Sequence, residues 1–335
     1  MILQEIFLCP VCKGDLELEV HFETQICIEE GLLTCQACGR TYPIKDGLIY
    51  FSSSASLSKK REVSWNLQSF EMAYRRNGYY EDSYKWRERH GIPKVVTDYD
   101  YPRVKGRLLD WLRPRNDDLI LDNGTGAGYF IFEMMNRYPN IRMNFVGLDV
   151  SKEHLKWLAY RRKREYKKNI LAVVGDATNL PFKNEVFNLI TCTEVLEHIF
   201  DPGSAVSEID RVLKPKGRAL LSTPSKSAFD FWNAILFAPR CLLGKKGRRE
   251  GSYDHPLYPK QLINFLSNNN FDILKYELNV VLPPQSMFSQ AQHYRIPMIL
   301  VPKIIKICDL LEDKMKYWFR SFALHMVIEA KKGKY

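Results

Sequence analysis

A glycine-rich loop preceded by an acid is the clearest sign of chemistry in this chain. The apolar residues 119–121 end at Asp122, and glycines follow at every second position, at Gly124, Gly126 and Gly128. Glycines let a chain turn tightly and let its backbone approach a ligand closely, although a plain tight turn would also explain them. A dinucleotide-binding loop would need one more glycine at position 129, which is a tyrosine here.

Further polar residues follow three later apolar runs that are typical of β-strands. The run 143–148 ends at Asp149, about 20 residues beyond the glycines, where an acid can accept hydrogen bonds from ribose hydroxyls. The run 170–174 leads into Gly175, Asp176 and Ala177, and the run 185–192 leads into Thr193.

Together these landmarks resemble the motifs of the class I S-adenosylmethionine (SAM) methyltransferases. The loop that starts at Asp122 is similar to their first motif, and residues 185–199 resemble the fourth motif of the type 11 methyltransferases, except that Asn188 stands where aspartate is usual. The turn 211–217 and the strand 218–223 complete the match. The resemblance implies an α/β fold with a Rossmann-like seven-stranded, mainly parallel sheet and helices on both faces.

The same resemblance implies SAM as the cofactor and adenine recognition by Asp176 and the backbone beside it. The predicted cofactor-binding residues are Asp122, Gly124, Gly126, Gly128, Asp149, Asp176, Ala177 and Thr193.

Two C-x-x-C pairs near the amino terminus predict a metal site. Cys9 and Cys12 form one pair and Cys35 and Cys38 the other, and four thiolates suit tetrahedral zinc. A redox dithiol is the alternative, but it would not need a second pair. Cys27 falls outside this spacing, and we expect it, like the three cysteines at positions 192, 241 and 308, to be a buried strand residue.

With their flanks, these cysteines resemble the small zinc-ribbon activator proteins that bind methyltransferases acting on tRNA, rRNA and translation factors. The resemblance covers residues 1–51 and implies a structural zinc in a closed site. A serine-rich linker, 52–60, then separates this ribbon from a methyltransferase domain at 61–335.

The composition and net charge of the chain limit the kinds of molecule that it can bind. The chain has 335 residues, 45% of them hydrophobic and 26% charged, and Met1 to Leu8 lack the features of a signal peptide, which indicates a soluble cytoplasmic protein. The net charge of +10 favours an anionic partner such as RNA, a phosphorylated substrate or a membrane surface. Part of it lies at positions 156–168, where a solvated helix face is the simpler explanation.

Three segments of the methyltransferase domain are candidates for contact with the substrate. The aromatic segment 61–105 is either a lid or part of the core, and 226–256 and 283–321 are insertions. The first insertion joins an apolar helix to the basic residues 245–249, which suits a membrane surface or a lipid-tailed substrate, whereas a packed cap is the simpler alternative.

A general base is needed only if the acceptor atom carries a proton at neutral pH. His198, after the fourth strand, and His255, in the first insertion, are the candidates, with a structural histidine as the alternative. Glu194 and Glu197, three residues apart on one helix face, are further candidates, with solvated carboxylates as the alternative. The predicted function is methyl transfer to a small-molecule or lipid-linked acceptor. An RNA methyltransferase and a non-catalytic SAM-binding scaffold, for which Asn188 is the only hint, are the alternatives.

Overall fold

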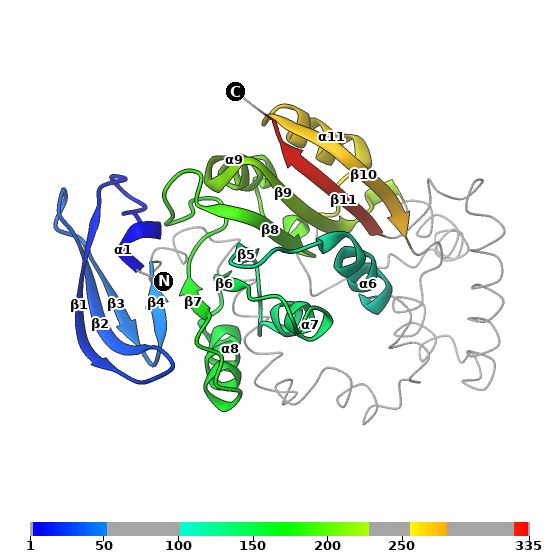
Figure 1. Ribbon diagram of the computed structural model, residues 1–335. Coiled ribbons are helices and arrows are strands. Elements are labelled where there is room, and N and C mark those ends of the chain that lie inside the picture. The colour runs from blue at the N-terminus through cyan, green and yellow to red at the C-terminus, as the bar shows by residue number, and fades with distance from the viewer. Residues whose placement is uncertain (1–2, 52–100, 228–254, 280–324, 334–335) are drawn as a thin grey trace, which may run out of the picture.

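One twisted β-sheet contains strands from both the amino-terminal and the carboxy-terminal parts of the described chain (Figure 1). The computed structural model describes residues 3–51, 101–227, 255–279 and 325–333. Over these ranges the sheet has eleven strands, in the order β1-β2-β3-β4-β7-β6-β5-β8-β9-β11-β10.

Seven of these strands form the sheet that the sequence predicts for the methyltransferase. In chain order they are β5 (Leu119–Asn123), β6 (Asn144–Asp149), β7 (Ile170–Val174), β8 (Phe187–Thr193), β9 (Leu213–Pro224), β10 (Phe271–Asn279) and β11 (His325–Lys332). The five strands β7, β6, β5, β8 and β9 pair in parallel, while β11 is antiparallel to both β9 and β10. The predicted seven-stranded, mainly parallel sheet is confirmed, and β9 begins earlier than expected, within the predicted turn 211–217.

Helices cover both faces of this sheet. They are α6 (Tyr101–Leu112), α7 (Tyr129–Arg137), α8 (Lys152–Arg164), α9 (Pro202–Val212) and α11 (Pro259–Ser267), with a short 3-10 helix η2 (Leu196–His198). Side chains alternate between the faces of a strand, so Ile120 packs with α6, α7 and α8, whereas Leu121 belongs to the cluster that contains α9 and α11. Asp201 caps α9 by accepting a hydrogen bond from the Ser204 amide, just before Pro202.

The amino-terminal ribbon extends the same sheet. It comprises α1 (Leu3–Ile6), β1 (Leu16–Glu23), β2 (Ile28–Cys35), β3 (Thr41–Lys45) and β4 (Leu48–Tyr50), with the four strands antiparallel to one another. β4 pairs in parallel with β7, and the Phe51 amide donates to the Val174 carbonyl at 2.9 Å. The strands of residues 3–51 therefore join the sheet of the enzyme.

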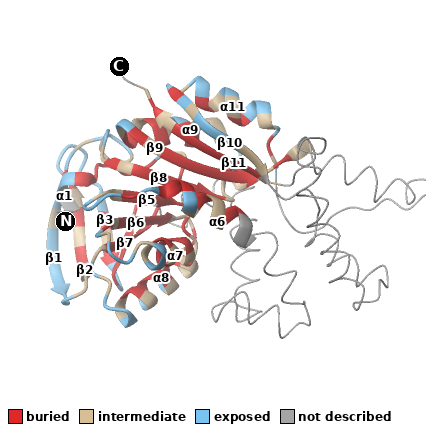
Figure 2. Ribbon diagram, turned by 45° about the vertical axis from the view of Figure 1, so that its right-hand side comes forward, coloured by how far each residue is buried: buried red, intermediate tan, exposed pale blue. Residues whose placement is uncertain are grey.

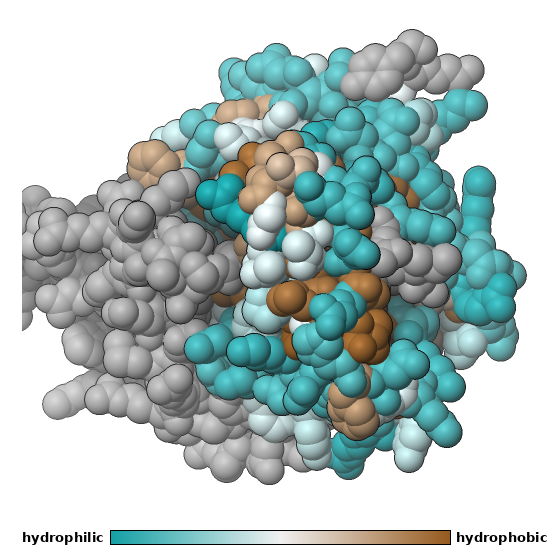
Figure 3. All heavy atoms as spheres, turned by 90° about the vertical axis from the view of Figure 1, so that its left-hand side faces the viewer, coloured by the Kyte–Doolittle hydropathy of each residue, from teal (hydrophilic) through white to brown (hydrophobic). Residues whose placement is uncertain are grey.

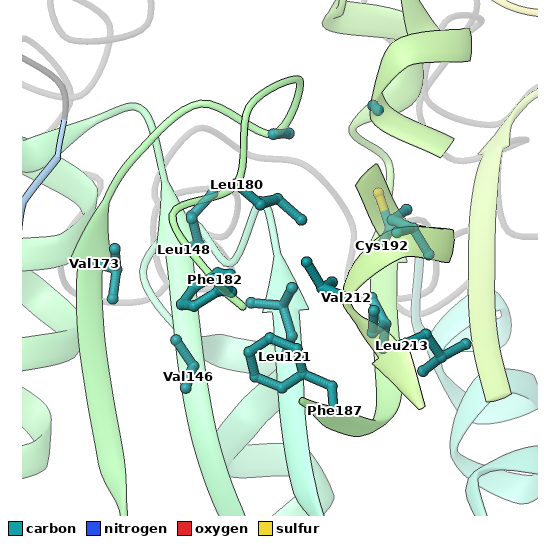
Figure 4. Packing of buried hydrophobic residues seen from close by; sticks show 14 of the residues in the cluster. Leu121, Val146, Leu148, Val173, Leu180, Phe182, Phe187, Cys192, Val212 and Leu213 are labelled. Carbon is teal, nitrogen blue, oxygen red and sulfur yellow. The ribbon is translucent and has the colours of Figure 1, made fainter. Parts of the chain in front are cut away.

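The ribbon and the enzyme also share one hydrophobic core. The ring of Phe7 stacks on Phe182 with centroids 5.3 Å apart, and Phe182 meets Phe187 edge-on at 5.0 Å. Figure 4 shows Phe182 and Phe187 beside Leu121 and Val146 of the enzyme sheet. A ribbon of this size can bury little hydrophobic core of its own. Its contact with the enzyme enlarges the hydrophobic core in which its side chains are buried.

The outer side of the ribbon faces solvent. Most residues of β1 are exposed, as the colouring of Figure 2 shows, and Phe22 keeps 55% of its surface accessible. Figure 3, which looks at this end of the molecule, shows a mostly hydrophilic surface around a compact hydrophobic area.

A buried arginine ties α8 to the ribbon. Arg162 is 1% exposed and donates to the carbonyl oxygens of Ile170 at 2.9 Å and Gly47 at 3.0 Å, and to the Cys27 sulfur at 3.0 Å. Lys163 beside it pairs with Glu29 at 2.5 Å. The prediction of a solvated basic face on this helix is therefore wrong for Arg162.

Two of the expected buried strand cysteines can be located. Cys192 is fully buried in β8, which confirms that prediction. Cys27 is half-buried and precedes β2, so the prediction of a buried strand residue is wrong there.

Several predicted features lie outside the described residues. They are the linker 52–60, nearly all of 61–105, most of 226–256, all of 283–321, Cys241 and Cys308. Residues 101–105 begin α6. Among the helices in the described ranges, none is both long and apolar enough to cross a bilayer.

Candidate active site and metal centre

The glycine loop between β5 and α7 combines close packing with an open backbone. Gly124 and Gly128 have positive φ, and a β-carbon would lie 2.3 Å from a methyl of Val195 at Gly124 and 2.4 Å from a methyl of Leu158 at Gly128. Gly126 also has positive φ, but a β-carbon there would meet no atom of the described residues within 4 Å. The first and last glycines are required by packing, and the middle one leaves the backbone accessible to a ligand.

The buried side chain of Asp122 stabilises this loop through hydrogen bonds. Its carboxylate is 2% exposed and accepts hydrogen bonds from the hydroxyls of Thr125 at 2.7 Å and Thr191 at 2.6 Å. Burial raises the pKa of Asp122, against the effect of these two hydrogen bonds. The side chain therefore joins the loop to β8 and lies beneath the ligand-facing surface.

Asp149 reaches the loop from the end of β6. One carboxylate oxygen accepts from the Gly126 amide and the other from the Ser151 amide, each at 2.8 Å. The side chain is half-buried, and every carboxylate oxygen can accept more than one hydrogen bond. Asp149 is thus fixed beside the open part of the loop.

Asp176 and Ala177 lie at the same edge, after β7. The Asp176 carboxylate accepts from the amide of Thr178 at 2.8 Å and from its hydroxyl at 2.7 Å, while Ala177 is buried. The Gly175 amide donates to the Asp149 carbonyl at 3.0 Å. The loops after β5, β6 and β7 therefore adjoin one another, because the carboxyl ends of parallel strands share one edge.

Thr193 ends β8 at this edge and precedes a cluster of carboxylates and histidines. Thr193 is 7% exposed and pairs with Ser222 of β9. Glu194, with a φ of 56°, accepts from the Ser222 hydroxyl at 2.8 Å, and its other oxygen lies 3.1 Å from Nδ1 of His325. Glu197 accepts from the Thr223 hydroxyl at 2.8 Å.

The surroundings give the two carboxyl groups of this cluster different pKa values. Burial and the neighbouring charge of Glu194 raise the pKa of Glu197 to about 8. Burial would also raise the pKa of Glu194, but the charge of His325 and hydrogen bonds from His325 and Ser222 lower it. At neutral pH, Glu194 is the ionised member of the pair and Glu197 the protonated one.

The histidines predicted as bases both lie beside this cluster. Nε2 of His198 is 3.8 Å from Oε1 of Glu197, and the His255 amide donates to the Glu197 carbonyl at 2.8 Å. The placement of Glu194 and Glu197 on one helix face is wrong, and so is the alternative that they are solvated: Glu197 is 2% exposed in η2, and Glu194 precedes this helix.

His325 was missed by the sequence reasoning. It is the first residue of β11, more than 100 residues after Glu194, and its side chain is 16% exposed. An antiparallel strand begins at the edge where its parallel neighbours end, so the first polar residue of the last strand was the available signal.

The four ribbon cysteines converge as predicted. The sulfurs of Cys9, Cys12, Cys35 and Cys38 all lie within 4.8 Å of one another. The Cys9–Cys38 and Cys12–Cys35 sulfur separations are 3.7 and 3.4 Å. Four thiolates about 2.3 Å from a tetrahedral zinc would be about 3.8 Å apart, so this geometry fits zinc with little adjustment.

The residues around these sulfurs complete the metal centre. A β-carbon on Gly14 would lie 2.8 Å from the β-carbon of Ala37 and 3.2 Å from the Cys35 sulfur, which explains a glycine there. The Tyr42 hydroxyl is 3.0 Å from the Cys9 sulfur, an outer contact of the kind that orients metal ligands.

The strand order, the glycine loop and the acids after β6 and β7 define the fold of a class I methyltransferase. Comparison with protein families agrees: residues 115–253 match the Methyltransf_31 methyltransferase domain, and residues 2–47 match the Trm112p-like proteins. The chain therefore combines a class I methyltransferase domain with a Trm112-like amino-terminal domain.

Individual proteins also match. The ubiquinone/menaquinone biosynthesis C-methyltransferase UbiE of Ruegeria sp. (strain TM1040) is 32% identical over 40% of this chain and 53% of its own length. The ubiquinone biosynthesis O-methyltransferase of Paracidovorax citrulli is 27% identical over 50% and 68%. The crystal structure of YcgJ from Bacillus subtilis matches 70% of this chain and 100% of its own, with 21% identity and a TM-score of 0.48. The chain spans about half the length of the first curated relatives it matches.

Proposed function

We propose that this protein transfers a methyl group from SAM to a small-molecule acceptor, including acceptors that carry a lipid tail. The observation that carries the proposal is the methyltransferase match over residues 115–253, which contain the open glycine loop and Asp149. SAM, when bound, supplies a methyl group on a sulfonium, so the protein chiefly has to align the acceptor and exclude water. Alignment of this kind accounts for about 7 to 11 kcal/mol of barrier lowering.

In this proposal the predicted cofactor residues divide into two roles. Gly126 and Asp149 face the ligand, Asp149 as the acceptor of ribose hydroxyls, and Asp176 and Ala177 flank the adenine. Asp122 and the two packed glycines keep the loop in shape, with Thr193 at the end of the neighbouring strand.

The acceptor class rests on the relatives and on the carboxylate–histidine cluster. The two named relatives are a C-methyltransferase and an O-methyltransferase of ubiquinone biosynthesis, and both kinds of acceptor atom carry a proton before the reaction. His198 and His255 adjoin Glu197 at the same edge and are candidates for removing that proton.

RNA is the second candidate acceptor, favoured by the Trm112-like domain and the net charge of +10. The basic helix α8 supports an RNA acceptor less than the number of basic residues in this helix suggests. Arg162 is buried against the ribbon, Lys163 pairs with Glu29, and Arg161 lies over the Phe132 ring, 3.8 Å from its centre. These residues stabilise the protein itself.

The alternative of a non-catalytic SAM-binding scaffold rests on Asn188. The contacts of Asn188 connect neighbouring strands of the sheet. Its amide oxygen accepts from the Leu119 amide at 3.1 Å and from the Lys214 ammonium at 3.2 Å. Leu119 begins β5 and Asn188 is the second residue of β8, so this position lies at the opposite end of the strands from the glycine loop. A substitution there leaves the proposed chemistry intact.

The test is transfer of a labelled methyl group from SAM to fractions of a cell extract, beside calorimetry with S-adenosylhomocysteine. We expect binding of S-adenosylhomocysteine and label in the organic-soluble fraction. Label in RNA instead would favour the second candidate, and no binding would refute the proposal. Co-sedimentation with anionic vesicles over a salt range tests peripheral membrane contact, which the basic residues 245–249, outside the described residues, suggest.

A further inference from the structure

A buried carboxamide lies directly before the glycine loop. Asn123 is the last residue of β5 and is 0% exposed. Neither its side-chain oxygen nor its side-chain nitrogen has a hydrogen-bond partner. In the described part of the chain, no other side chain has two buried polar atoms in this state. Such a group destabilises the ligand-free protein, and a partner from outside the chain would remove that penalty.

We propose that Asn123 binds the amino-acid end of SAM, with Oδ1 accepting a hydrogen bond from the ammonium group and Nδ2 donating one to the carboxylate. A carboxamide suits this end of the cofactor because it carries an acceptor and a donor side by side. This inference rests on the proposed methyl transfer and adds a side-chain contact to its cofactor site.

The strand fixes where this side chain points. Asn123 pairs with Leu148 of β6, and the Leu148 carbonyl accepts from the Gly124 amide at 2.8 Å. Consecutive residues of a strand point to opposite faces, so Asp122 and Asn123 point apart. The Asp122 carboxylate accepts from two threonine hydroxyls. Asn123 instead shares its face with the buried hydrophobic residues Leu121 and Leu148, which Figure 4 shows.

The order of the strands indicates which part of the cofactor lies at Asn123. β7, β6 and β5 are neighbours in that order. Asp176, after β7, is the proposed adenine residue, and Asp149, at the end of β6, is the proposed ribose residue. In SAM the amino-acid end is attached to the ribose through the sulfur. The next position along the edge, at the end of β5, therefore belongs to the ammonium and carboxylate groups.

The burial of the carboxamide sets a condition on binding. Because Asn123 has no exposed surface in this structure, a ligand reaches it only if the loop that follows it shifts. Glycines give this loop the necessary freedom, and a β-carbon at Gly126 would have no atom of the described residues within 4 Å. The contact therefore forms during cofactor binding, as the loop moves away from the end of β5.

An ordered water molecule is the other partner that a buried carboxamide can have. A buried water needs several polar partners of its own, and the hydrophobic side chains of Leu121 and Leu148 supply none. A ligand group that carries both a donor and an acceptor fits this position better.

Calorimetry with two ligands tests the contact in the full-length protein. S-adenosylhomocysteine has the amino-acid end, whereas 5′-methylthioadenosine has the same adenine, ribose and sulfur but lacks that end. Asn123→Leu keeps the volume of the side chain and removes both polar atoms. We expect this variant to bind S-adenosylhomocysteine about 10-fold or more weakly and to change the affinity for 5′-methylthioadenosine by less than about twofold.

The stability of the ligand-free protein is a second readout. Because Asn123→Leu removes two unpartnered polar atoms, the urea midpoint should stay the same or rise. Ser225→Ala is the matched control, since Ser225 is also 0% exposed with an unpartnered hydroxyl but follows β9. It should leave both affinities unchanged. Asn123→Ala makes the same comparison with a smaller side chain if the leucine variant does not fold.

A crystal structure with S-adenosylhomocysteine bound should place Oδ1 or Nδ2 of Asn123 within about 3.5 Å of the amino-acid group. The inference fails if Asn123→Leu binds S-adenosylhomocysteine as tightly as the wild type, as expected where only a water molecule contacts the carboxamide. It also fails if both ligands are weakened alike, because the substitution would then disturb the whole loop. Absence of S-adenosylhomocysteine binding to the wild type would instead refute the proposed function.

Discussion

Replacing Arg162 with methionine should destabilise the whole chain, because this buried side chain joins the enzyme to the ribbon. Its guanidinium donates to the Ile170 carbonyl in the enzyme and to the Gly47 carbonyl and the Cys27 sulfur in the ribbon. Methionine fills a similar volume but donates nothing. Two carbonyl oxygens and the nearby Glu29 carboxylate would lose a buried positive partner.

The expected cost follows from that geometry. Each buried acceptor left without its charged donor costs about 1 to 3 kcal/mol, and breaking a buried charge network costs about 3 to 5 kcal/mol in total. A loss of that size is a large part of a typical stability of about 5 to 15 kcal/mol. In a chain of 335 residues it corresponds to a fall in Tm of about 4 to 7 °C.

Urea unfolding followed by tryptophan fluorescence measures the effect. Arg164→Met is the matched control, because Arg164 is exposed on the same helix, and it should change the unfolding free energy by less than about 0.5 kcal/mol. Equal stability of the two variants would show that the buried arginine does not join the ribbon to the enzyme.

Three further predictions concern the two sites. Asp149→Ala should weaken S-adenosylhomocysteine binding in a folded protein by removing a charged acceptor for ribose hydroxyls, and unchanged affinity by calorimetry would remove that assignment. Cys12→Ser should lose zinc while Cys27→Ser retains one ion per chain, as measured by metal analysis, and the reverse would show the ligands to be misassigned. Because the pKa of Glu197 is raised to about 8 in the folded state, its protonated form stabilises the fold at low pH, and this contribution is lost as pH rises from about 4 to 8. Glu197→Gln should reduce that decline in urea titrations, and an identical pH dependence in wild type and variant would contradict the burial argument.

Local pattern was sufficient for the strands of the enzyme sheet. The run 170–174 coincides with β7, Asp149 is the last residue of β6, and Asp176 follows β7 as expected. Buried parallel strands are short apolar runs, so their ends are marked by the first polar residue or glycine. The spacing of the four cysteines was equally informative, because a metal centre requires particular side chains at short separations.

Pairings between distant segments could not be predicted in this way. Nothing in residues 48–50 indicates β7 as their partner, because a backbone ladder depends little on side-chain identity. Arg162 belongs to a run of basic residues that look alike in sequence. It is buried because the ribbon packs against it, which the sequence of the helix does not indicate. His325 required the topology of the last strand, and Glu197 required the turn that directs it inward.

The pairing of β4 with β7 also affects how the protein is made. Tyr50 ends β4 and Ile170 begins β7, 120 residues later. At about 5 to 20 residues per second, a ribosome needs about 6 to 24 seconds to synthesise that interval. The hairpins of the ribbon can close meanwhile, but the edge of β4 stays unpaired and open to association with other nascent chains. Synonymous codons that slow translation of this interval should therefore lower the soluble yield without changing a single residue.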